Sequence, residues 1–354
     1  MPISSPRLAK NLTSLAYLLD ANQLSIHHPS HPLSLSLSGQ MDEHYDFEAA
    51  RTALAAIIVD RKAHDATHSQ LAEIDLTSVH VQSLQHPKCW KLVDNNQDET
   101  SIAQCVVRLQ GIVHSKMLPP LPNPTSMHAM QRARPHIRQA VTITGLGLPA
   151  FDEFIEKIEN VYMAFYDVFP NNTMEGWHPG QADGFPAITA QTRYFERVHA
   201  HGTAVPSVGF TNYEDPNGVL AAMEADGFVH GEDNSVEYRA RYIDTTRNTA
   251  TYKHINPVTI KEGDIVEVSI TFAVYPTKDR KHVFVPHIKG ILLLSQEQRE
   301  KAAILRMRSR FKPEVPPPTM KRKNLYPDEE IVEEARAKVS KLSLDDTTHS
   351  MQLE

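Results

Sequence analysis

Apolar and polar residues alternate with a period of two in the second half of the chain. The alternation runs from Val236 to Tyr242 and again from Ile265 to Tyr275. Because successive side chains of a strand point to opposite sides of a sheet, this period predicts two strands. A further apolar run from His282 to Leu294 follows a short polar stretch, which predicts a hairpin. We therefore expect an antiparallel sandwich or a small barrel in this half.

Other segments carry apolar residues at intervals of three and four, the spacing that places them on one side of a helix. A Pro- and Ser-rich stretch, residues 25–40, separates the first two of them and predicts a linker. The predicted helices lie at residues 8–19, 45–65, 151–165, 295–311 and 328–342.

These patterns together predict an α+β protein with three parts. Residues 1–85 would form a helical, partly flexible N-terminal region. Residues 86–295 would form the α+β core, with the antiparallel β domain beginning at about residue 185. Residues 296–354 would form a helical, partly disordered extension, basic and mobile in its middle.

Composition narrows the class of protein. The chain has 354 residues, a formal net charge of −7 and only two cysteines, Cys89 and Cys105. Two cysteines exclude a four-cysteine zinc site and a disulfide-rich scaffold. No stretch approaches the roughly 20 apolar residues of a membrane span, and the first residues lack the apolar core of a signal peptide. We expect a soluble protein of the cytoplasm or nucleus, with no membrane partner.

One short segment suggests metal chemistry. His230 and Glu232 are two positions apart at the start of a predicted strand, and His287 lies on a later one. Two histidines and one carboxylate hold Fe(II) in non-haem oxygenases, and residues two apart on a strand share a side. If Val283 and Val285 are in the core, His287 points inward with them. The alternative is a polar turn, in which Asp and Asn bond their own backbone.

A second hypothesis concerns nucleic acid. Arg239, Arg241 and Tyr242 share one predicted strand, and an arginine-rich helix and the basic run Lys321 to Lys323 follow. Such groups could supply phosphate contacts and stacking to a single strand. However, the arginines of the strand face away from its tyrosine, and the acidic net charge opposes binding by charge alone. Nucleic acid is therefore possible as a partner but not favoured.

The second half of the chain also resembles a group of uncharacterised open reading frames from mushroom-forming (basidiomycete) fungi. The resemblance rests on the Asp215-Pro216-x-Gly218 turn, the segment from His230 to Asn234, and the run from Gly263 to Val268. It implies a fungal, intracellular setting and no particular activity.

The sequence thus predicts a binding or accessory protein with an unspecified ligand. Whether the protein is an enzyme stays open, the alternative being a mononuclear Fe(II) oxygenase with His230, Glu232 and His287 as ligands. The second alternative is a single-stranded nucleic-acid-binding β-barrel module. A protein partner could dock on the C-terminal helix, residues 328–342.

Overall fold

The computed structural model describes part of the chain, and everything below refers to that part. The described residues are 41–64, 70–85, 88–95, 103–122, 126, 131–170, 173–198, 205–244, 249–310 and 332–340. The chain divides into two compact units, residues 1–308 and 309–354. In the second unit, residues 332–340 are helical. The helix predicted at residues 8–19, the linker 25–40 and the basic run 321–323 lie outside the described residues.

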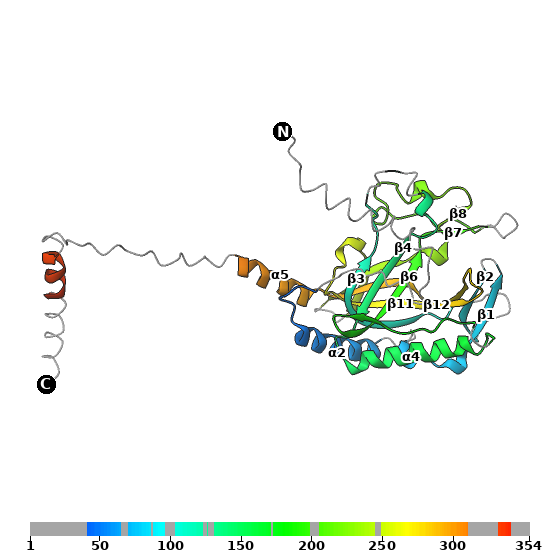
Figure 1. Cartoon of the computed structure of the whole chain (residues 1–354), viewed down its shortest axis with the longest axis horizontal. Helices are drawn as coiled ribbons and strands as arrows, with labels where there is room; N and C mark the ends of the chain where they lie inside the picture. The colour runs from blue at the N-terminus through cyan, green and yellow to red at the C-terminus, as the bar shows by residue number, and fades with distance from the viewer. Residues whose placement is uncertain are drawn as a thin grey trace. The chain divides into compact units, whose positions relative to one another are not determined.

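The first unit is built on one large mixed sheet (Figure 1). Ten strands form this sheet, and a separate pair, β7 and β8, forms a second one. The strands are β1 (Val79–Gln85), β2 (Lys88–Asp94), β3 (Val107–Met117), β4 (Arg138–Thr144), β5 (Gly180–Ala182), β6 (Phe185–Arg193), β7 (Glu196–Arg197), β8 (Phe228–Val229), β9 (Glu237–Asp244), β10 (Thr249–His254), β11 (Ile265–Pro276) and β12 (His282–Ser295).

Neighbouring strands of the main path follow the order β10-β9-β12-β11-β3-β4-β6-β5, and β2 pairs with β11 beyond the end of β3. All pairs are antiparallel except β9 with β12, which is parallel. The sheet curls, so that β6 also lies against β12, where Thr192 Oγ1 donates a hydrogen bond to the Ile288 carbonyl at 2.8 Å. Five strands, β3, β4, β6, β12 and β11, therefore complete a circuit.

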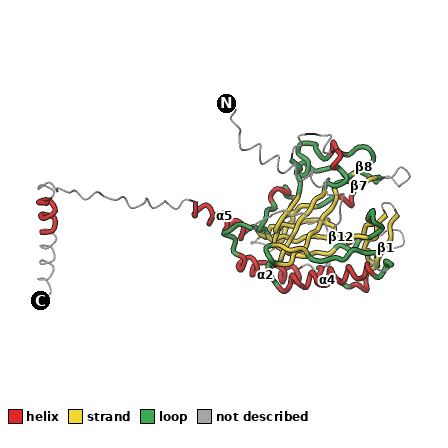
Figure 2. The backbone as a smooth tube through the Cα atoms, in the orientation of Figure 1, coloured by secondary structure: helices red, strands yellow, loops and turns green. Residues whose placement is uncertain are grey.

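Three helices accompany the sheet: α2 (Phe47–His64), α4 (Pro149–Tyr166) and α5 (Glu297–Arg310). Helix α4 begins with Pro149 at its first turn, where the missing N–H costs nothing. Its buried stripe, which includes Phe151, Ile158 and Phe165, packs on core residues of the sheet. Helix α2 contributes Ala50 and Leu54 to a core cluster that also contains Ile112 of β3 and Ile265 of β11. Figure 2 shows α2 and α4 running along the same edge of the strands. Of the helices in the described residues, none is long and apolar enough to span a membrane.

The expected division into a helical N-terminal region and a C-terminal sandwich or small barrel is wrong. Strands begin at Val79, and β3 and β4 lie inside the same sheet as β11 and β12. The physical reason is long-range pairing: β3 pairs with β4 on one side and with β11 on the other, and no local pattern in the sequence shows which strands pair. Antiparallel pairing itself is confirmed over most of the sheet. The predicted domain bounds stay a prediction.

Candidate nucleic-acid interface

The outer side of β4 and β6 carries two arginines directly opposite each other. Along β4, Val141 and Ile143 point into the core, so Arg138 points to the other side. The register pairs Arg138 with Arg193 of β6, and residues opposite each other on antiparallel strands share a side. Like charges in this arrangement destabilise a sheet. The fold alone gives no reason to keep this pair.

Two further basic residues join the arginines. Burial lowers the pKa of His136, and the charges of Arg138, Arg193 and Lys278 lower it further. Burial also lowers the pKa of Arg138, and Arg193 adds to that effect. The strand register places Arg138 opposite Arg193, His136 precedes Arg138 by two residues, and the charge of Lys278 acts on His136. We call His136, Arg138, Arg193 and Lys278 the Arg138 cluster.

Acidic groups contribute little to the Arg138 cluster. The side-chain partner of Arg138 is a neutral amide, since its Nη1 donates to Gln191 Oε1 at 2.9 Å. Burial and the charge of Asp233 raise the pKa of Glu196, although the charge of Arg193 acts to lower it. Among the residues that the structure describes, no carboxylate forms an ion pair with a member of the cluster. The cluster is therefore a positive patch without a matched negative charge.

A carboxylate with several donors lies beside this patch. Asp233 accepts hydrogen bonds from Lys91 Nζ at 2.6 Å, from Lys289 Nζ at 3.1 Å and from Gln104 Nε2 at 2.8 Å. Burial acts to raise the pKa of Asp233, but Lys289 and Lys91 hold it well below its ordinary value. The next residue, Asn234, donates through Nδ2 to the Arg193 carbonyl at 3.1 Å. This second group, Lys91, Gln104, Asp233 and Lys289, is the Asp233 knot.

The segment from His230 to Asn234 is a turn fixed by hydrogen bonds. Asn234 Oδ1 accepts from the Gly231 amide at 3.1 Å, and the Asn234 carbonyl accepts from Gln139 Nε2 at 3.0 Å. Residues 232–234 form a single turn of 3₁₀ helix. Asn234 therefore bonds the backbone of its own turn, as the polar-turn alternative predicts, whereas the Asp233 carboxylate binds side chains of other strands and loops.

The structure does not bring the three predicted iron ligands together. His230 is buried, with its Nδ1 2.7 Å from the Tyr194 carbonyl, whereas Glu232 is exposed. His287 lies on the outer side of β12 with its ring 5.4 Å from that of Tyr275, while Phe284 and Ile288 fill the core. No three His, Cys, Asp or Glu side chains form a metal-binding group within the described ranges. Iron binding stays a prediction without support from this geometry.

Arg239 and Arg241, the two strand arginines that the sequence indicates for nucleic-acid binding, form ion pairs with carboxylates of this chain. Arg239 Nε donates to Glu237 Oε2 at 2.9 Å, and Arg241 is ion-paired with Asp60 of α2. Tyr242 is exposed and has Lys253 Nζ 5.2 Å above its ring. Sequence reasoning missed Arg138 and Arg193. Their only signal was an arginine at the start of one strand and at the end of another.

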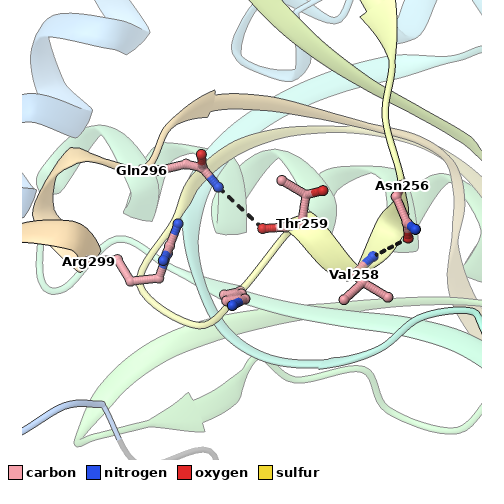
Figure 3. Close-up of a pocket in the computed structure, with 6 residues that line it drawn as sticks. Asn256, Val258, Thr259, Gln296 and Arg299 are labelled. Carbon is pink, nitrogen blue, oxygen red and sulfur yellow. Dashed lines mark hydrogen bonds between the residues drawn. The ribbon is translucent and has the colours of Figure 1, made fainter. Parts of the chain in front are cut away.

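A hollow of about 380 Å³ lies elsewhere on the first unit (Figure 3). Its polar groups are used within the chain: Gln296 Nε2 donates to the Thr259 carbonyl, and Asn256 Oδ1 accepts from the Val258 amide. Arg299 Nε donates to Asp264 Oδ1 at 2.6 Å. The hollow is thus a weaker candidate for a charged ligand than the Arg138 cluster.

Comparisons with known proteins add little. No protein-family model and no curated protein matches the chain. Among solved structures, the chain is similar to gp2.5, a single-stranded DNA-binding protein encoded by bacteriophage T7. The identity is 11%, the TM-score is 0.28, and the similarity covers 54% of this chain and 86% of that chain. A TM-score this low does not establish a shared fold, and the fungal resemblance stays a prediction.

Proposed function

We propose that this protein binds single-stranded nucleic acid across the outer side of β4 and β6, with the Arg138 cluster contacting phosphates. The observation that carries the proposal is the Arg138–Arg193 pair, two like charges opposite each other with no carboxylate between them. Like charges directly opposite each other on neighbouring strands destabilise a sheet, and no contact of this pair within the described residues offsets that cost. Such a departure from local stability is typical of a functional site. Guanidinium groups bind phosphate through paired N–H donors, so a phosphate would relieve the repulsion.

Strand topology supports the same assignment. Numbered along the chain, the circuit consists of β3, β4, β6, β11 and β12, and its order in space is 1-2-3-5-4. In five-stranded domains that bind oligonucleotides or oligosaccharides, the ligand lies on strands 2 and 3 and on the loops after strands 1 and 4. Here strands 2 and 3 are β4 and β6, and the two loops carry His136 and Lys278. A cationic site favours nucleic acid over a neutral saccharide.

The test is fluorescence anisotropy with a labelled single strand of about 15 nucleotides, a length that spans the sites of such domains. We expect salt-dependent binding by the wild type and weaker binding by the double variant Arg138→Gln/Arg193→Gln. The loss should be at least about tenfold, since a hydrogen bond to a charged group contributes about 1.5 kcal/mol or more. The slope of log K against log salt should fall by about 0.7 for each phosphate that the variant no longer binds.

A control for loss of a positive charge elsewhere is Arg51→Gln, which removes one half-exposed arginine from α2, where it pairs with Glu48. This variant should bind nearly as the wild type does. Flat titrations of the wild type at low salt would refute the proposed function, as would equal affinities of the double variant and Arg51→Gln.

A further inference from the structure

The Asp233 knot has the composition of an anion-binding site that is already filled from within the chain. Two ammonium groups and one amide converge on the oxygens of a single carboxylate, at 2.6, 3.1 and 2.8 Å. The side chains of Lys91 and Lys289 are 11% and 20% exposed, whereas that of Asp233 is 46% exposed. The donors are thus fixed and largely buried, and the acceptor is the most accessible member.

The knot also adjoins the Arg138 cluster. Asn234 binds the Arg193 carbonyl, so the turn that carries Asp233 is attached to the end of β6. Burial lowers the pKa of His287, and the charges of Lys289, Lys91 and, to a smaller extent, Arg193 lower it further. His287 faces the same side of β12 as Lys289 two residues on. A strand that contacts Arg193 would therefore reach the lysines of the knot next.

We propose that Lys91, Lys289 and Gln104 form a second phosphate site, continuous with the Arg138 cluster, in which Asp233 takes the place of a phosphate until nucleic acid displaces it. This inference rests on the proposed function and adds that Asp233 competes with nucleic acid for Lys91 and Lys289. Asp233 lowers the affinity for nucleic acid and limits the number of phosphates held. Because one carboxylate holds both lysines, one phosphate of an oligonucleotide that already contacts the Arg138 cluster can take its place.

The experiment compares Asp233→Asn with Glu232→Gln, an exposed neighbour in the same turn that changes the net charge equally. We expect Asp233→Asn to bind the labelled single strand about tenfold more tightly than Glu232→Gln at low salt. Its salt slope should be steeper by about 0.7, the value for one additional phosphate contact. Adding Lys289→Gln should reverse most of the gain, whereas Lys289→Gln alone should weaken binding much less than tenfold, because the phosphate contact of Lys289 in the wild type is offset by the contact with Asp233 that it replaces.

The outcomes separate this inference from the proposed function. If the wild type binds and the Arg138→Gln/Arg193→Gln variant does not, but Asp233→Asn matches Glu232→Gln, the second site is wrong and the first stands. If the wild type itself does not bind at low salt, the proposed function fails as well. Thermal unfolding shows whether Asp233→Asn is folded. If that variant does not fold, the single variant Lys289→Gln provides the test. A loss of affinity of about tenfold in this variant would contradict occupation of that lysine by Asp233.

Discussion

Two groups of charged residues lie on the same sheet and differ in how their charges are matched. Beneath α2, Arg61 donates to both oxygens of Glu267 at 2.7 and 2.9 Å, and both side chains are only 2% exposed. Gln110 Nε2 adds a hydrogen bond to Glu267 at 2.7 Å. On the outer side of β4 and β6, by contrast, Arg138 faces Arg193.

The pKa values of the arginines express this difference. Burial acts to lower the pKa of Arg61, but the hydrogen bond and the charge of Glu267 raise it above its ordinary value. Burial and Arg193 both lower the pKa of Arg138. A charge that the fold buries is matched by a partner from the chain, because an unmatched one would cost several kcal/mol, roughly 3–5. A charge kept accessible and unmatched is available to a ligand.

The largest effect is expected from breaking the matched group. Glu267→Gln leaves Arg61 buried without its counter-charge and should lower the free energy of unfolding by about 3–5 kcal/mol. Denaturation by urea measures this change. The control is Glu48→Gln, which breaks the exposed pair with Arg51 and should cost less than about 0.5 kcal/mol. Equal stabilities of the two variants would show that the buried pair does not differ from a surface pair.

A smaller effect is expected from titration of His136. In the free protein its pKa is lowered by burial and by its three cationic neighbours, so the imidazole is neutral near pH 7. A bound phosphate would raise that pKa, and binding would then take up a proton. Affinity should therefore increase as the pH falls from about 7.5 to 5.5, by up to about tenfold for a shift of one unit.

The same group has the opposite effect on the free protein. Because the folded state lowers the pKa of His136, its contribution to stability is present above the unfolded value of about 6.5 and is lost as the pH falls below it. Anisotropy titrations across this range, with His136→Gln as the control, check the binding effect. An identical pH profile in the variant would exclude His136 from the site.

Several elements could be predicted from the sequence because their patterns are local. Helices α2 and α4 lie where apolar residues recur at helical spacing, and β11 lies where Val266 to Val274 alternate with other residues. The place of β3 in the sheet could not be predicted in this way, because β3 pairs with β11 from a distant part of the chain. The alternation rule also misplaced His287: Val283 and Val285 are partly exposed, and Phe284 and Ile288 are the core residues.

The candidate site depends on pairings that no local pattern reveals. Arg138 and Arg193 are separated along the chain by α4 and β5, and only the register of β4 with β6 places them opposite each other. Likewise, Asp233 meets Lys91 and Lys289 because β2 and β12 both pair with β11. The sequence indicates His230 and Glu232 as candidate ligands in the segment from His230 to Asn234. In the structure, it is Asp233 and Asn234 that attach this segment to the sheet.

The most direct test of the unmatched pair is charge reversal at one of its members. Arg193→Glu would place a carboxylate opposite Arg138 and convert repulsion into attraction, which contributes about 0.2–1 kcal/mol across a strand pair. We predict that thermal unfolding of this variant, without ligand, shifts upward by up to about 3 °C while its affinity for single-stranded nucleic acid falls. A lower unfolding temperature, or an affinity equal to that of the wild type, would contradict the claim that this pair is kept for an anionic ligand.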